Sequence, residues 1–320
     1  MTPSRLSISD KALRVCCDVV PGQGSQTPGF LTPWLELEGA RERLERYAEA
    51  AQVDLVAAGT EWDAERIRDT AVAQPLIVAA SLLSYAALQD AAGAAPAGVA
   101  GHSVGEVAAL VAAGVVSEDD GMRLVGLRGR TMADAAAQEQ TGMSAILGGD
   151  RDGVLALLDE LGLTPANHNG AGQIVAAGAQ DALAELTAHP VAGSRVIPLQ
   201  VAGAFHTSYM APAVATLRTA AAEVAASDPA LALWTNRDGA RVASGREALD
   251  LLVAQVSSPV RWDLCMESFA DAGVTGIIEL APAGTLTGLA KRALRGVPTV
   301  AVKTPDDLAA AAALLTGGDA

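Results

Sequence analysis

The pentapeptide G-H-S-V-G at residues 101–105 constrains the fold of this chain more than any other segment, because it requires a sharp turn between two elements. Small apolar residues at 98–100 precede it and predict a strand, and helix formers at 106–113 follow it up to Gly114. Glycines two residues before and after a serine allow the turn to expose the Ser103 hydroxyl at the start of the helix. Amide donors and the positive end of the helix dipole favour a developing oxyanion there. The pattern therefore predicts a nucleophilic serine suited to acyl transfer.

Strand-like and helical runs alternate along much of the chain, which indicates an α/β architecture with a mainly parallel sheet. Strands are expected at residues 15–20, 98–103, 276–280 and 299–303. Helices are expected near residues 41–51, 75–90, 106–113, 119–137 and 306–315. The alternation favours a body resembling an α/β-hydrolase.

The rhythm changes between residues 141 and 200, where the expected order is β-α-β-β-α-β. The strands are expected at 143–147, 164–167, 173–177 and 195–199, and the helices at 154–161 and 181–189. This order is that of a ferredoxin-like unit, whose natural size is about sixty residues. The sequence thus predicts an α/β-hydrolase-like catalytic body (13–138 and 206–316), an inserted ferredoxin-like subdomain (139–205) and an N-terminal extension (1–12).

The composition excludes several classes of protein. A formal charge of −15 and a pI near 4.6 argue against binding to nucleic acid or to an anionic membrane surface. No uninterrupted apolar run reaches the length of a membrane span, and the N-terminal residues show no signal-peptide pattern. Cys16, Cys17 and Cys265 offer neither a disulfide framework nor metal-ligand spacing, so we expect small apolar fillers. The expectation is a cytoplasmic monomer with no bound metal or redox cofactor.

A serine nucleophile needs a base, and the chain has four histidines. Strand alternation points His102 away from the serine, and His189 precedes a proline at a helix end, where it is expected to cap carbonyl groups. His168 lies in an expected polar turn, and His206 follows the point where the inserted subdomain rejoins the body. From the residues alone, both His168 and His206 remain candidates for the base.

A second glycine-containing loop, P-G-Q-G-S-Q at residues 21–26, follows the first expected strand. Loops of this kind gather at the carboxyl edge of an α/β sheet, where active sites form. Its amides could supply an oxyanion donor that complements the amide of Val104. Such a turn is weak evidence alone and gains weight beside the serine motif.

Five segments occur in one order along the chain: P-G-Q-G-S-Q at 21–26, Q-P at 74–75, G-H-S-V-G-E at 101–106, R-G at 128–129 and G-A-F-H at 203–206. This order resembles the malonyl-CoA:acyl carrier protein transacylases of type II fatty acid synthesis, and the acyltransferase domains of polyketide synthases are similar. The resemblance extends from about residue 19 to about residue 302.

The resemblance implies a role for each matching position. Ser103 would carry the malonyl ester, and His206 would act first as general base and then as the acid that protonates the departing CoA thiol. The backbone amides of Gln23 and Val104 would form the oxyanion hole. Arg128 would pair bidentately with the malonyl carboxylate and select malonyl over acetyl groups.

Four further positions follow from the same resemblance. The backbone carbonyl of Gln255 would orient the histidine in place of a triad acid. Gln74 and Asn167 would line the acyl or thioester pocket. The bulk of Phe205, beside the histidine, would disfavour an α-methyl group.

The reaction implied is a ping-pong transfer: malonyl-CoA acylates the serine, CoA leaves, and the phosphopantetheine thiol of an acyl carrier protein takes the malonyl group. A stand-alone polyketide-pathway acyltransferase, a serine esterase with an acid behind the histidine, and a non-catalytic acyl-CoA-binding module are the alternatives. Carrier proteins are typically acidic, so a local basic patch must receive one on this acidic chain. The candidates are Lys291, Arg292 and Arg295 in one cluster, with Arg195 or Arg151 on the inserted subdomain.

Overall fold

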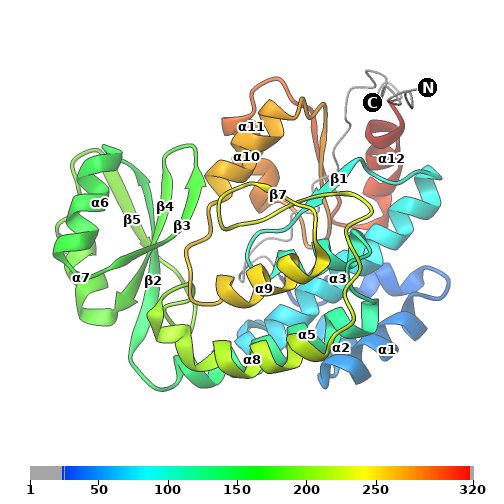
Figure 1. Ribbon diagram of the computed structural model, residues 1–320, viewed down its shortest axis with the longest axis horizontal. Coiled ribbons are helices and arrows are strands. Elements are labelled where there is room, and N and C mark those ends of the chain that lie inside the picture. Colours follow the sequence, from blue (N-terminus) through cyan, green and yellow to red (C-terminus); the bar gives the residue numbers. More distant parts are fainter. Residues whose placement is uncertain (1–23, 25, 318–320) are drawn as a thin grey trace, which may run out of the picture.

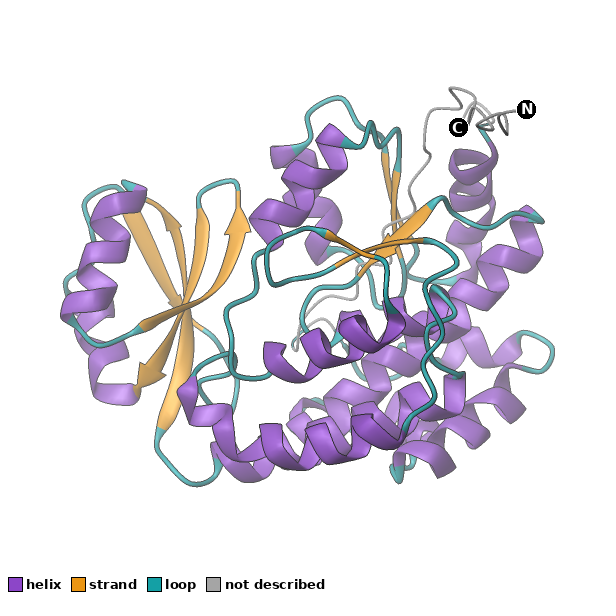
Figure 2. Ribbon diagram, viewed as in Figure 1, coloured by secondary structure: helices purple, strands orange, loops and turns teal. Residues whose placement is uncertain are grey.

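The computed structural model describes residue 24 and residues 26–317, and it shows a mixed α/β protein with a four-stranded sheet at one end and a larger helical body at the other (Figures 1 and 2). The expectation of a mixed α/β chain is therefore confirmed. Several features expected from the sequence lie outside the described residues: the extension at 1–12, the strand at 15–20 with Cys16 and Cys17, and most of the loop that contains Gln23.

The larger body consists of helices around short strands. Its helices are α1 (Ala40–Ala51), α2 (Leu55–Thr60), α3 (Thr70–Ala92), α4 (Gly105–Ala112), α5 (Glu118–Ala136), α8 (Ala211–Glu223), α9 (Gly245–Gln255), α10 (Trp262–Asp271), α11 (Thr285–Ala293) and α12 (Leu308–Thr316). Short 3₁₀ helices span Thr32–Glu36, Arg66–Arg68, Ser208–Met210 and Pro305–Asp307. Its strands are β1 (Gly98–Ala100), β6 (Ala232–Trp234), β7 (Arg241–Val242), β8 (Ile277–Glu279) and β9 (Thr299–Ala301).

These body strands pair in two groups within the described part of the chain. Strand β1 lies parallel to β6, which pairs antiparallel with β7, and β8 lies parallel to β9. Two of these three pairs are parallel, but among the described residues they lie in separate sheets instead of one mainly parallel sheet, and β7 adds an antiparallel edge. Cys265 is buried beside Trp262 and Phe269, as expected for an apolar filler.

Helix α3 runs through the core and begins five residues before the expected start at Pro75. The Asp69 carboxylate accepts a hydrogen bond from Ala71 N (2.8 Å) and caps the helix earlier than the proline would. Among the described helices, α3 is long and apolar enough to cross a bilayer, but 78% of its most apolar stretch is buried inside the protein. Core helices meet the same criterion, so this feature is weak evidence for a membrane.

The four-stranded sheet comprises β2 (Thr141–Gly148), β3 (Thr164–Gly170), β4 (Gln173–Ala179) and β5 (Ser194–Pro198), in the order β3-β4-β2-β5 with antiparallel neighbours. Helices α6 (Arg151–Glu160) and α7 (Gln180–Ala188) cover one of its faces (Figure 2). Successive residues of a strand face opposite sides, and this sheet buries both. Ile146 and Ala176 pack with the helices, whereas Ala145 and Val175 join the core of the body.

Edge strand β3 of this sheet is joined to the body by backbone hydrogen bonds. His168 N donates to Val260 O (2.9 Å), and Val260 N donates to Ala166 O (2.9 Å). The sheet edge is thus fixed to the segment that follows α9. Strand β3 extends to Gly170, so the expectation of a polar turn around His168 was wrong: the pairing with β4 continues through that residue.

Helix α5 packs closely against its neighbours because two of its glycines lack a Cβ. A Cβ at Gly126 would lie 2.3 Å from Ala51 O, at the end of α1, and one at Gly129 would lie 2.9 Å from Thr70 O, at the start of α3. These contacts set the position of the helix that carries Arg128.

We predict that Gly126→Ala lowers the free energy of unfolding by about 1–3 kcal/mol, because the new methyl group must push α5 away from backbone atoms of α1. Gly288→Ala is the matched control. Its Cβ would meet nothing within 4 Å inside α11, so we expect stabilisation of about 0.4–1 kcal/mol. Urea denaturation of both variants measures the difference, and an equal effect of the two substitutions would contradict the packing argument.

Candidate active site

The turn between β1 and α4 holds Ser103 in a strained conformation. Its φ is +55°, in the left-handed region that side-chain-bearing residues rarely adopt. A Cβ at Gly101 would lie 1.9 Å from the carbonyl carbon of Gly105, so only glycine fits this crossing. The turn has the geometry that the G-H-S-V-G pattern predicts, with the serine at the start of α4.

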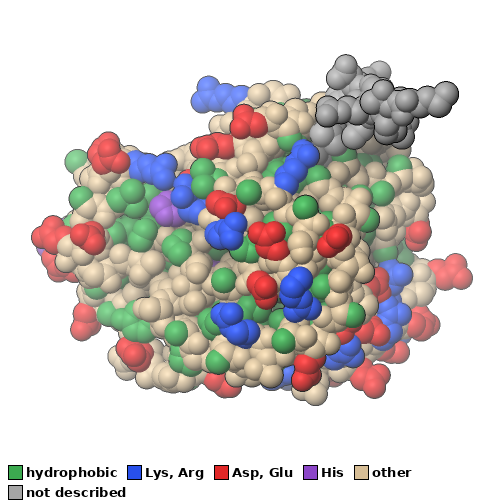
Figure 3. All heavy atoms as spheres, in the orientation of Figure 1, with side chains coloured by type: hydrophobic (Ala, Val, Ile, Leu, Met, Phe, Trp, Pro, Cys, Tyr) green, Lys and Arg blue, Asp and Glu red, His purple; other side chains and the backbone are tan. Residues whose placement is uncertain are grey.

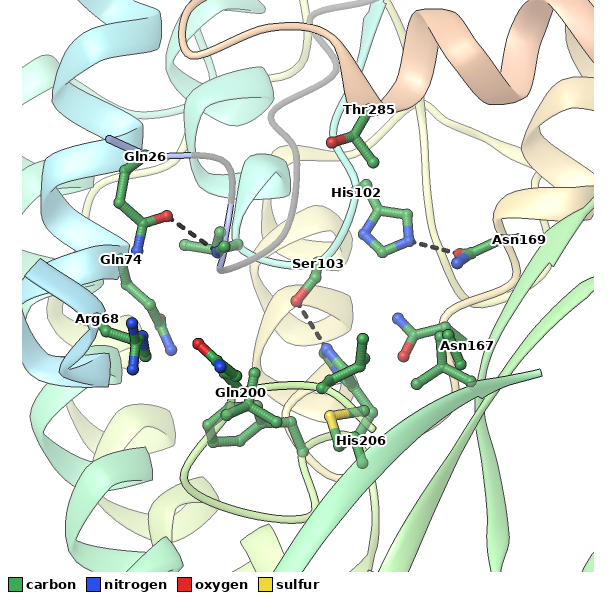
Figure 4. Close-up of a pocket in the computed structure, with 18 of the residues that line it drawn as sticks. Gln26, Arg68, Gln74, His102, Ser103, Asn167, Asn169, Gln200, His206 and Thr285 are labelled. Atoms are coloured by element: carbon green, nitrogen blue, oxygen red, sulfur yellow. Dashed lines mark hydrogen bonds between the residues drawn. The ribbon is translucent and has the colours of Figure 1, made fainter. Parts of the chain in front are cut away.

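The side chain of His206 meets this serine across the cleft (Figure 4). Ser103 Oγ lies 2.7 Å from His206 Nε2, and His206 Nδ1 lies 2.8 Å from the backbone oxygen of Gln255. Because a carbonyl oxygen only accepts, Nδ1 carries the proton, and Nε2 is left to accept from the serine hydroxyl. The order of contacts is therefore serine, histidine, carbonyl, and a carbonyl stands where a triad would place a carboxylate.

Burial and charge keep this imidazole neutral. His206 is 3% exposed. Burial lowers its pKa to about 3, and the nearby positive charge of Arg128 acts in the same direction. A neutral imidazole is the form that can accept the serine proton at physiological pH.

The other three histidines have partners other than the Ser103 hydroxyl or line another cavity, although His102 lines the same cavity as the pair. His102 faces Asn169, with 2.9 Å between its Nε2 and Asn169 Oδ1, as expected for a structural residue (Figure 4). His168 lines a different cavity, of about 280 Å³. His189 is the C-cap of α7, where its backbone N–H donates to Glu185 O (2.9 Å), and its imidazole lies 3.6 Å from the Glu185 carboxylate. The structure thus resolves the choice of serine partner in favour of His206.

Arg128 is a buried cation, only 1% exposed. Its Nη1 donates to Gln74 Oε1 (2.5 Å) and its Nη2 donates to Gln255 Oε1 (2.8 Å), whereas its Nε has no partner among the described residues. Burial lowers the pKa of Arg128 to about 10, and the negative charge of Glu106 opposes that shift. The guanidinium is therefore held by two neutral amides, with an unused donor.

Most of the expected site residues line one cavity of about 510 Å³ between the body and the small sheet. The residues expected from the sequence that line it are Gln74, Ser103, Val104, Arg128, Asn167, Phe205 and His206. The side-chain amide of Gln255 accepts a hydrogen bond from Arg128, and Gln23 lies outside the described residues. Gln26, Arg68, Gln200 and Thr285 also line the cavity and were not expected (Figure 4), and neither was Met132.

Comparison with known proteins agrees with this geometry. Residues 19–310 match the family model described as "Acyl transferase domain". The protein named "Malonyl CoA-acyl carrier protein transacylase" from Mycobacterium tuberculosis is 53% identical over 292 residues, which cover 91% of this chain and 97% of that protein. The chain belongs to the malonyl-CoA:acyl carrier protein transacylase family.

Solved structures of such transacylases have the same fold. The crystal structure of MCAT from Mycobacterium tuberculosis matches with a TM-score of 0.89 at 53% identity and covers 92% of this chain and 98% of that one. A type II PKS acyl-carrier protein in complex with its malonyl-transacylase matches with a TM-score of 0.87 at 30% identity, covering 95% of this chain and 100% of that one.

Among the described residues of the present transacylase, no group of three or more His, Cys, Asp or Glu side chains could hold a metal ion.

Sequence reasoning missed two buried residues that support the serine turn. Asn236 Oδ1 accepts from Ser103 N (2.7 Å), and Asn236 Nδ2 donates to Gly101 O (2.7 Å). Asn236 N in turn donates to Glu106 Oε1 (2.5 Å). One sequence feature could have marked Glu106 as part of the site: it is a lone acidic residue in an apolar helix directly after the serine motif. No sequence feature marked Asn236, because it follows a three-residue strand far away in the sequence.

The low pKa of His206 predicts how the reactivity of Ser103 depends on pH. Protonation inactivates the base, so the rate should stay nearly constant between pH 8 and pH 5, changing by less than about threefold. An ordinary histidine with a pKa near 6.5 would lower it about thirtyfold at pH 5. The measurement is the rate of Ser103 modification by the neutral reagent phenylmethanesulfonyl fluoride, with Ser103→Ala as the unlabelled control. A midpoint near pH 6.5 would contradict the buried, neutral imidazole.

Proposed function

We propose that this chain transfers a malonyl group from malonyl-CoA to the phosphopantetheine thiol of an acyl carrier protein through an ester on Ser103. The observation that carries the proposal is the buried Arg128 guanidinium in the same cavity as the Ser103–His206 pair. The serine pair suits acyl transfer in general, and the buried cation suits an acyl group that carries its own negative charge.

In the first half-reaction, Ser103 Oγ attacks the thioester carbonyl and its proton passes to His206 Nε2. Asn236 already occupies the amide of Ser103, so the amide of Val104 is the proposed donor to the oxyanion, with Gln23 as the second donor. Collapse of the intermediate breaks the carbon–sulfur bond, and the departing CoA sulfur takes the proton from His206. In the second half-reaction the carrier thiol gives its proton to His206 and attacks the ester, and Ser103 regains a proton as the thioester forms.

The malonyl carboxylate must lose its water when it enters the cavity, and an unpaired buried charge is costly. Arg128 is proposed to bind it bidentately through donors that face the cavity, with Gln74 beside it. Acetyl groups bring no such charge and gain nothing from the guanidinium. Phe205 is 6% exposed beside His206, where its bulk is proposed to disfavour an α-methyl group. Asn167 is proposed to line the acyl or thioester pocket from β3.

The chain is proposed to be divided into a catalytic body (13–138 and 206–316) resembling an α/β-hydrolase, an inserted subdomain (139–205) and an extension (1–12). The strand order β3-β4-β2-β5, with both helices on one face, supports a ferredoxin-like subdomain. We further propose that the protein is a cytoplasmic monomer that needs no bound cofactor and meets its carrier protein transiently.

The contact behind the histidine argues against the esterase alternative, because that mechanism would place an acid where Gln255 supplies a carbonyl. A polyketide-pathway carrier remains a second candidate partner. The observation that favours it is the structural match to a transacylase solved with a type II PKS acyl-carrier protein.

The first test is intact-protein mass spectrometry after brief mixing with malonyl-CoA or acetyl-CoA. We expect a malonyl adduct in the unaltered protein and none in Ser103→Ala. In Arg128→Ala the rate of malonyl labelling should fall about a hundredfold or more relative to acetyl labelling, because a buried carboxylate loses its charged partner. Equal labelling by both thioesters in the unaltered protein would refute the role proposed for Arg128.

Carrier docking is proposed to use Lys291 and Arg292 in the last turn of α11 together with Arg295 just beyond its end; the first residues of this helix line the cavity. Lys291, Arg292 and Arg295 are exposed, and the face shown in Figure 3 mixes acidic and basic side chains. Arg195 is exposed on β5, whereas Arg151 lies 3.6 Å from the Asp263 carboxylate and is a weaker candidate.

We predict that reversing the charge of Lys291 and Arg292 to Glu raises the KM for carrier protein about tenfold or more, because it removes local attraction for an acidic partner. The rate of Ser103 acylation by malonyl-CoA serves as the control and should not change. Steady-state assays over a range of carrier concentrations measure the effect. An unchanged KM would exclude this patch.

A further inference from the structure

Glu106 is a buried carboxylate. Neither the serine motif nor the proposed reaction assigns it a role. It lies on α4, three residues after the nucleophile, and is 6% exposed. Leu110, Leu233, Leu251 and Thr235 lie around it with almost no free volume, so its polar partners, which include the Thr235 side chain, come from the protein itself.

Both carboxylate oxygens of Glu106 accept hydrogen bonds. Oε1 accepts from Asn236 N (2.5 Å), and Oε2 accepts from Gln255 Nε2 (2.6 Å). Gln255 Nε2 also lies within hydrogen-bond distance of Ser103 O (3.0 Å) and Asn236 Oδ1 (3.2 Å). All of these neighbours of the NH₂ group are therefore acceptors.

These contacts determine which way the Gln255 amide faces. With its NH₂ directed to Glu106, its oxygen is directed to Arg128, where it accepts from Nη2 (2.8 Å). The reversed amide would bring its NH₂ against a guanidinium that has only donors, and its oxygen against acceptors. The backbone of Gln255 also supplies the carbonyl that orients His206. One residue thus connects the carboxylate, the guanidinium and the base.

We propose that Glu106 is a positioning residue for acyl-group selection: its acceptor-only carboxylate fixes the Gln255 amide and thereby holds Arg128 ready for the substrate carboxylate. This inference rests on the proposed function. It assigns Glu106 no contact with the substrate, since Gln255 lies between the carboxylate and Arg128.

Substitution by glutamine tests the orientation directly. In Glu106→Gln the new side-chain amide has one acceptor oxygen, which Asn236 N requires, so its NH₂ would face the NH₂ of Gln255 and disfavour the native amide orientation. We expect the ratio of malonyl to acetyl labelling rates at Ser103 to fall about tenfold in this variant, the order expected when a hydrogen bond to a charged group is lost. In the Arg128→Ala background the same substitution should leave the ratio unchanged. Glu49→Gln, at an exposed position on α1, is the matched control.

The unaltered protein supplies a second measurement that does not depend on how the variant folds. Burial raises the pKa of Glu106 to about 7, against the opposing effects of its hydrogen bonds and the charge of Arg128. The other titratable groups near it in the described part of the chain are Arg128 on α5, Cys265 on α10 and His206. Burial raises the pKa of Cys265 and lowers that of His206 to about 3, so neither changes charge between pH 8 and pH 6.

Protonation adds a donor to the Glu106 carboxyl, as the glutamine substitution does. The labelling ratio of the unaltered protein should therefore fall as the pH is lowered from 8 to 6, and this dependence should be absent in Glu106→Gln. A ratio that is constant with pH, or that rises as the pH falls, overturns the proposal, and so does an equal loss of malonyl and acetyl labelling in the variant. Failure of malonyl-CoA to label Ser103 at any pH would instead refute the proposed function.

Discussion

The burial of one guanidinium controls the arrangement of this molecule around its cavity. A cation that is 1% exposed must have acceptors and a counter-charge, and Arg128 on α5 obtains them from three other helices. Gln74 comes from α3, Gln255 from the end of α9, and Glu106 from α4. Glycines on α5 permit close backbone contact with α1 and with the start of α3, which brings Gln74 and Arg128 together. The packing of these helices therefore also sets the position of the Arg128 guanidinium. A shift of one helix would move this guanidinium relative to its partners.

The second constraint is backbone strain at both residues of the Ser103–His206 pair. Both Ser103 (φ +55°) and His206 (φ +62°) adopt the left-handed region, at a cost of order 1–3 kcal/mol each. Buried hydrogen bonds offset that cost on the serine side, where Asn236 bonds to the backbone on both sides of His102. On the other side of the cavity, the bonds of β3 to Val260 fix the small sheet to the segment after α9. The same region after α9 thus meets the small sheet through Val260 and holds His206 through the backbone oxygen of Gln255.

The sequence predicted the features that depend on neighbouring residues. The order of strand-like and helical runs identified the strands of the small sheet and both of its helices, and the helical runs at 41–51 and 119–137 located α1 and α5 within a few residues. The sequence could not show whether His168 or His206 partners Ser103. The contact between Ser103 and His206, which lie 103 positions apart, is set by tertiary folding alone. The elements between residues 206 and 275 were not expected. There β6 has three residues and β7 has two, too few for a period-2 pattern to appear, and Asn236 lies two residues after the end of β6.

The carbonyl that stands behind His206 in place of a carboxylate is consistent with an acyl group that is itself an anion. An acid at that place would raise the pKa of the imidazole, as in a serine–histidine–acid triad, but it would also put a negative charge close to Arg128. That charge would compete with the substrate carboxylate for the guanidinium. A backbone carbonyl fixes the same tautomer through Nδ1 without adding a charge. The neutral carbonyl of Gln255 therefore orients His206 without placing a second carboxylate, besides Glu106, close to Arg128.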